Sequence, residues 1–185
     1  MCAEYEDGST TRGEVEVDAE QNQGRRVGRI WLEPAVSIHP AAAAAIPTFD
    51  AVIIGPGSFY TSLIPTFLPD GVRDAIVTVD GPIVLVTNLL TEGRGMKGFT
   101  AGAAVSRFSE EIGRPVDVVI VNTGHPGEES LARYAREHKE PLPVGDVPDG
   151  CEVITGEFWQ GAFARHTRRR LAYAVWGVLS QRLLG

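Results

Sequence analysis

A buried strand that runs directly into a glycine-rich loop is encoded by the stretch DAVIIGPGSFYTS, residues 50–62. Between Asp50 and Gly55 the stretch is continuously apolar, a pattern typical of a strand that is buried on both faces. Open α/β sheets bind their ligands at the carboxyl ends of such strands. The stretch therefore predicts a parallel sheet and also the edge of that sheet at which a ligand would lie.

Two further segments, Pro82–Asn88 and Val116–Asn122, are also apolar, β-branched and flanked by turn residues. Parallel strands need long crossovers. We therefore expect an α/β, Rossmann-like three-layer sandwich with a mostly parallel sheet whose core spans residues 50–125. Its predicted crossover helices are Phe59–Leu68, Val72–Val79 and Thr100–Ile112, with Thr100 as the N-cap; residues 76–79 fit a strand equally well.

The amino-terminal region, residues 1–34, is predicted to form an antiparallel β-hairpin. Asp7-Gly8 is a turn signal, Glu14–Val17 alternates polar and apolar residues, and Pro34 ends the last arm. The polar stretch Asp18–Arg26 is expected to be a loop. A short helix should follow His39-Pro40, because proline suits a first helical turn and five alanines come next.

The carboxyl-terminal third is predicted to be helical at two places. Glu128–Lys139 forms the first helix, and Phe163–Leu184 the longest one, since its apolar residues recur at helical spacing. The Pro-rich, acidic segment Glu140–Gly150 between them is expected to be a surface loop. One domain, residues 1–185, is the default for a chain of this length.

Composition excludes several classes of function. With 24 acidic and 17 basic residues, the net charge is −7, so we expect no nucleic-acid partner. No apolar run is long enough to span a membrane, and the amino terminus is acidic, unlike a signal peptide. The two cysteines form no CxxC pair and no histidine has a partner at ligand spacing, so we predict a cytoplasmic protein without a metal site.

The glycine-rich loop is the strongest candidate site. Gly55 and Gly57 would let backbone N–H groups cradle an anion, while the hydroxyls of Ser58, Thr61 and Ser62 would donate hydrogen bonds. On spacing alone, a plain tight turn with hydroxyls that cap the next helix explains the residues equally well.

Polar residues elsewhere are weaker candidates. Asn88 ends the second strand at the same sheet edge and could orient a ligand, or simply end the strand. Arg94 could pair with a phosphate, although a solvated arginine is the commoner outcome. The basic run Arg165–Arg170 reads as a solvated helix face, with His166 able to complete a pocket.

The chain also resembles a known family, the UDP-N-acetylglucosamine-binding gluconeogenesis factors, which are homologous to 2-phospho-L-lactate transferase. The resemblance is carried by Glu6-Asp7-Gly8-Ser9, Leu32-Glu33-Pro34, the octet Gly55–Ser62, Asn88-Leu89 and Gly98-Phe99-Thr100, in this order. It implies a ligand set of Gly55, Pro56, Gly57, Ser58, Tyr60, Thr61, Ser62, Asn88, Thr91, Arg94 and His166.

The chain departs from the family pattern in three places. The family begins with a strand and a Gly-Gly-Gly-Thr-Gly loop that this sequence lacks, so we expect it to correspond to the carboxyl-terminal part. Residues 91–96 read TEGRGM where the family tends to have Thr-Gln-Pro-Gly-Glu-Thr. Thr167 follows Arg165-His166 where the family favours aspartate.

Three functions follow from the resemblance. The first is a nucleotide-sugar-binding regulator of carbon metabolism or cell-wall homeostasis, without catalysis. The second is a transferase of phosphate-bearing groups that would use a divalent cation such as Mg²⁺. The third is an assembly half that completes a partner chain. Because three strands are few for a sheet, we expect a homo-oligomer or a partner chain, and weak nucleotide-sugar binding by this chain alone.

Overall fold

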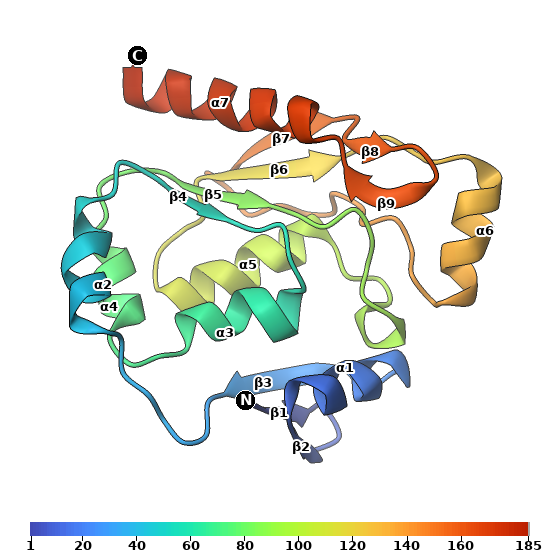
Figure 1. The fold of residues 1–185 in the computed structure, drawn as a ribbon, viewed down its shortest axis with the longest axis horizontal. Coiled ribbons are helices and arrows are strands. Elements are labelled where there is room, and N and C mark those ends of the chain that lie inside the picture. Colours follow the sequence, from blue (N-terminus) through green and yellow to red (C-terminus); the bar gives the residue numbers. More distant parts are fainter. Residues whose placement is uncertain (185) are drawn as a thin grey trace.

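A central parallel sheet lies between two layers of helices in the computed structural model, which describes residues 1–184 (Figure 1). Its strand order is β4 (Val52–Ile54), β5 (Ile83–Val86), β6 (Val118–Asn122) and β7 (Glu152–Gly156). All neighbours are parallel, so the carboxyl ends of the strands meet at one edge. The predicted α/β, Rossmann-like fold is confirmed.

The two faces of this sheet are covered by different helices. Successive side chains of a strand point to opposite faces. Leu85 and Val119 therefore pack with the layer of α3 (Ile64–Phe67), α4 (Val72–Val77) and α5 (Ala101–Ile112), whereas Val84 and Val118 pack toward α7 (Arg168–Leu184). The apolar runs of the inner strands reflect burial on both sides.

The predicted crossover helices are present. Thr100 caps α5 by accepting a hydrogen bond from Ala103 N–H at 3.0 Å, as expected. The helix predicted from Val72 is present as α4 but ends at Val77, so the ambiguous residues 76–79 form the end of a helix and a turn, and no strand. The helix expected from Phe59 begins as a π-helical turn, Phe59–Leu63, before α3. The remaining helices are α2 (Pro40–Ala45), the 3-10 turns Ile46–Thr48 and Arg94–Met96, and α6 (Glu128–Arg136).

Phe108 of α5 anchors the glycine-rich loop to the core. It is fully buried, and its ring makes edge-to-face contacts with Phe59 and Phe67, at centroid distances of 5.1 Å and 5.9 Å. Such aromatic pairs add to the free energy of burial. Phe59, which directly follows Gly55–Ser58, is thereby packed against the helical layer.

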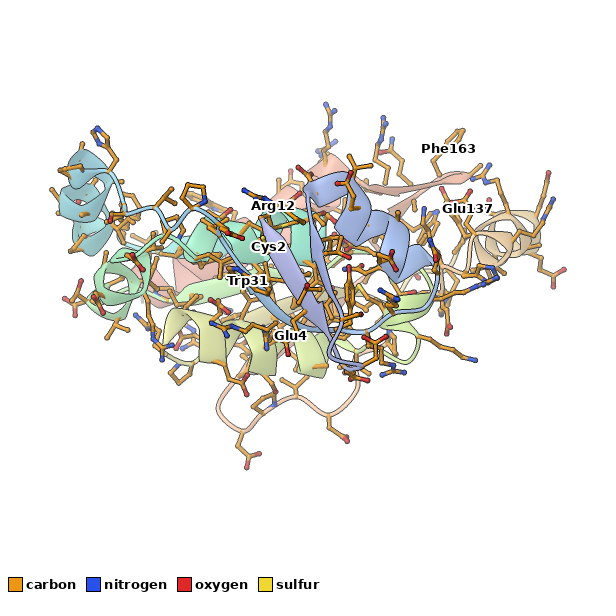
Figure 2. The ribbon with its side chains drawn as sticks, turned by 90° about the horizontal axis from the view of Figure 1, so that it is seen from below. Cys2, Glu4, Arg12, Trp31, Glu137 and Phe163 are labelled. Atoms are coloured by element: carbon orange, nitrogen blue, oxygen red, sulfur yellow. The ribbon has the colours of Figure 1, made fainter. Side chains whose placement is uncertain are left out.

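A second, antiparallel sheet of order β2-β1-β3 packs beneath α3 and α5 (Figure 1). Its strands are β1 (Cys2–Tyr5), β2 (Thr10–Arg12) and β3 (Val27–Trp31). Cys2 is paired with both Arg12 and Trp31, and Figure 2 shows these three residues side by side. The predicted β-hairpin region is confirmed for β1 and β2.

The segment after β2 is a helix, α1 (Glu14–Asn22), so the strand predicted at Glu14–Val17 is wrong. The loop predicted at Asp18–Arg26 is wrong in its first half and present in its second, between the end of α1 and the start of β3. Val15 is 75% exposed, whereas Val17 and Gln21, one helical turn apart, are buried. The alternation of Val15 and Val17 thus resembled a strand by chance. Two glutamates in the first turn favour the helix electrostatically.

The strand at the opening stretch is not buried on both faces, contrary to the prediction. In the parallel sheet β4 is the edge strand and pairs with β5 alone, which leaves Ile53 45% exposed. The fourth strand, β7, was missed. It covers the opposite edge, where its half-exposed Glu152–Gly156 carries little apolar signal.

The helix predicted from Phe163 begins only at Arg168. Phe163–His166 forms β9, which pairs with β8 (Trp159–Gln160) across a turn that contains Gly161 at φ 61°. The positive φ of Gly161 favours chain reversal over helix continuation. Within residues 1–184, no helix combines the length and the apolar character that crossing a membrane requires.

Candidate functional site

An open cleft of about 790 Å³ lies at the carboxyl edge of the parallel sheet. Its lining residues come from the loops after β4 and β5, from β9 and the start of α7, from α1 and from the segment after α6. Figure 1 shows where these elements lie. This is where the fold class places ligands. The lining residues are Asp18, Pro56, Gly57, Ser58, Asn88, Glu92, Lys139, Ala164, Arg165, His166, Arg168 and Leu171.

Gly55 sets the course of the loop as it leaves β4. Its φ is 83°, which side chains other than glycine rarely adopt, and a Cβ there would lie 2.7 Å from the Val86 carbonyl oxygen. At Gly57 the φ is not positive, and a Cβ would meet side-chain atoms alone, the nearest being Leu63 Cδ2 at 3.0 Å. Gly55 therefore turns the chain, and Pro56, Gly57 and Ser58 then line the cleft.

The polar groups of the loop converge on a carboxylate of the same chain, that of Glu92. Phe59 N–H lies 3.0 Å from both Glu92 oxygens, and the Ser58 hydroxyl donates to Oε2 at 3.1 Å. Asn88 Nδ2 donates to Oε1 at 2.6 Å. These donors thus hold a carboxylate that belongs to the protein itself.

Asn88 and Thr61 hold this arrangement together. Asn88 Nδ2 also donates to the Gly57 carbonyl oxygen at 2.8 Å, so this one amide joins the loops that follow two neighbouring strands. The Thr61 hydroxyl lies 2.7 Å from the Ser58 hydroxyl. The side chains of Ser58, Thr61 and Asn88 are all engaged within the protein.

Burial raises the pKa of Glu92, because the charged carboxylate loses water. The hydrogen bonds from Phe59, Ser58 and Asn88 act in the opposite direction, and the nearby Asp18 carboxylate raises the pKa further. None of the ion pairs found among residues 1–184 includes Glu92. Neutral donors therefore hold this carboxylate.

The other side of the cleft is basic. Arg165 and Arg168 take part in none of the ion pairs formed by residues 1–184, whereas Lys139 pairs with Glu137 at 2.9 Å. His166 lies beside them on β9, and burial lowers its pKa, an effect that the Thr87 backbone opposes. Two unpaired guanidinium groups and an imidazole thus face one cleft, a set suited to a phosphate.

Five residues of the predicted ligand set line this cleft: Pro56, Gly57, Ser58, Asn88 and His166. The other six lie elsewhere. Gly55 shapes the turn, and Thr61 is buried beneath Ser58. Tyr60 packs edge-to-face on Phe59 at 4.8 Å, where burial raises its pKa.

The outer members of the set have other contacts. Ser62 is exposed outside the cleft, and its carbonyl accepts a hydrogen bond from the Thr66 hydroxyl. Thr91 is buried and joins its loop to Glu140 through bonds of 2.8 Å and 3.0 Å. Arg94 pairs with His138, away from the cleft.

Sequence reasoning missed Asp18, Glu92, Lys139, Arg165 and Arg168 as members of the site. A signal existed for Glu92, which lies four residues after Asn88 in the loop that follows β5. Arg165 and Arg168 belong to the basic run Arg165–Arg170, which was interpreted as a solvated helix face because the β8–β9 hairpin that brings Arg165 to this edge was not predicted. Within residues 1–184, no three His, Cys, Asp or Glu side chains group as a metal would require.

Comparison with known proteins identifies relatives along most of the chain. Residues 1–159 match the family model described as 2-phospho-L-lactate transferase CofD. A putative gluconeogenesis factor of Aquifex aeolicus is 34% identical over all of this chain and 58% of its own length. The gluconeogenesis factor of Listeria monocytogenes is 30% identical over 97% of this chain and 56% of its own length.

The fold is also similar to that of a solved structure. A Bacillus halodurans protein described as a member of the UPF0052 family shares 27% identity and a TM-score of 0.83, covering 94% of this chain and 58% of the other. The chain thus spans somewhat more than half the length of these relatives. The resemblance read from the sequence motifs is confirmed.

Proposed function

The chain belongs to the family of 2-phospho-L-lactate transferase CofD and the gluconeogenesis factors, and on this basis we propose that it is a regulatory protein that binds a nucleotide-sugar such as UDP-N-acetylglucosamine. The ligand lies in the cleft at the carboxyl edge of the sheet. Its diphosphate contacts Arg165, Arg168 and His166, and its sugar or base lies toward Asn88 and Ser58.

One observation carries the proposal: two guanidinium groups without carboxylate partners face an open cleft that also holds neutral polar groups. Planar guanidinium groups bind phosphate oxygens bidentately. The chain as a whole repels anions, because its net charge is −7, so a local cationic wall is what a phosphate-bearing ligand needs. A cleft of about 790 Å³ is of the size typical for small-molecule sites.

Calorimetry with matched arginine variants tests the proposal. Arg168→Met removes one cation of the cleft, whereas Arg169→Met removes the same charge next to it, from a side chain that contacts Tyr173 outside the cleft. We expect UDP-N-acetylglucosamine to bind the Arg168 variant roughly tenfold more weakly, the effect of losing one charged hydrogen bond. The Arg169 variant should bind like the wild type. Equal weakening by both would mean that only net charge matters, and no binding by the wild type would reject the proposal.

A further inference from the structure

The loop Gly55–Ser62 is a complete anion site that already contains its anion. Three donors from two loops, Phe59 N–H, the Ser58 hydroxyl and Asn88 Nδ2, meet at the Glu92 carboxylate within 2.6–3.1 Å. A carboxylate offers about four lone-pair positions. The three donors occupy most of that capacity, with the Phe59 N–H shared between the two oxygens.

Glu92 also sets the charge on its side of the cleft. It lines the cleft together with Asp18 of α1. Arg165 and Arg168 lie across the sheet edge, on β9 and α7, on the side of the sheet opposite α1 (Figure 1). The cleft thus has an acidic wall (Asp18, Glu92) and a basic wall (Arg165, Arg168).

This arrangement contradicts the simplest expectation from the sequence, in which the loop amides hold the phosphate of the ligand. A phosphate at Phe59 N–H would have to displace Glu92 and would then lie near Asp18. The negative charges of the phosphate and of Asp18 would repel each other, and this repulsion is stronger where water is excluded. At the basic wall, a phosphate would find the free donors of Arg165 and Arg168. It would neither displace Glu92 nor lie beside Asp18.

We propose that Glu92 determines the specificity of the cleft: it occupies the donors of the loop, confines the ligand's anionic group to the basic wall and leaves room at the acidic wall only for an uncharged part. The inference rests on the proposed function and adds the orientation of the ligand. Compounds that would place a second anionic group at the acidic wall are rejected.

Inorganic pyrophosphate is the probe, and the backbone amide of Phe59 is the reporter, followed by two-dimensional NMR. In the wild type, pyrophosphate should leave the Phe59 resonance in place and shift those of Arg165 and His166. In Glu92→Ala the emptied donors accept pyrophosphate, so the Phe59 resonance should shift on titration. The apparent affinity should rise roughly tenfold, as expected for gaining one charged hydrogen bond.

Two further variants separate the local contact from net charge and from misfolding. Asp18→Asn removes the same charge from the same wall and leaves the loop donors bound to Glu92. In this variant, the Phe59 resonance should therefore stay in place when pyrophosphate is added. Glu92→Gln keeps the side-chain shape and should give an intermediate response. A Phe59 shift in the wild type, or no Phe59 shift in either Glu92 variant, would overturn the inference. Failure of UDP-N-acetylglucosamine to bind the wild type would reject the proposed function alone.

Discussion

The change Gly55→Ala tests how the loop is built at the end of β4. Alanine at a φ of 83° costs about 1 kcal/mol, because its Cβ crowds the backbone. The same Cβ would also lie 2.7 Å from the Val86 carbonyl oxygen, which is part of the buried strand β5 and cannot move freely. Forcing extra volume into a packed site costs about 1 to 3 kcal/mol more. The free energy of unfolding should fall by about 2 to 4 kcal/mol.

Gly8→Ala is the matched control. Gly8 has nearly the same φ, 79°, but nothing lies within 4 Å of a Cβ there, so only the conformational cost of about 1 kcal/mol should appear. Urea unfolding of both variants, followed by circular dichroism and tryptophan fluorescence, measures the difference. If Gly55→Ala is no more destabilising than Gly8→Ala, the close approach of the loop to β5 is not as described.

Three further expectations follow from the same contacts. Phe108→Ala should lower the free energy of unfolding by about 3 to 5 kcal/mol in urea titrations, because a fully buried ring that anchors Phe59 is lost; a cost below 1 kcal/mol would contradict this role. Burial lowers the pKa of His166, so the unfolded chain binds its proton more readily, and stability should fall as the pH falls from the ordinary histidine pKa through the lowered one. His166→Gln should remove that part of the pH dependence of the urea midpoint, and an unchanged dependence would show that His166 is not buried in solution. Finally, the open edge of β4 with Ile53 exposed, and Tyr173 and Trp176 each about two-thirds exposed on α7, lead us to expect self-association; light scattering that finds only monomers would contradict it.

The fold was predictable from sequence wherever local signals and burial agreed. The inner strands β5 and β6 are β-branched runs buried on both faces, and Thr100 caps α5 where a helix start was expected. At β4 the same apolar pattern occurs on an edge strand, because sequence cannot show which neighbours a strand will have. At Glu14–Val17 the two-residue alternation agreed with a helix as well as with a strand, and only the burial of Val17 with Gln21 distinguishes them.

The site was predictable only in part, for a related reason. The loop Gly55–Ser62 and Asn88 could be read locally, because strand ends and glycines mark them. Glu92 could not be assigned to the loop donors, since that contact depends on how two loops meet across a strand pair. Arg165 reaches the cleft through the β8–β9 hairpin, whose second strand, β9, was expected to be helix. The predicted and observed sites therefore differ in the residues whose positions depend on contacts between distant parts of the chain.

Chemical-shift mapping of UDP-N-acetylglucosamine on the isotopically labelled chain tests the central claim most directly, since it detects even weak binding and locates it. The account predicts saturable shifts at Gly57, Ser58, Asn88, Arg165 and His166, with the Phe59 amide unchanged. The claim would be contradicted by the absence of saturable shifts, or by shifts confined to the exposed face of α7 around Tyr173 and Trp176.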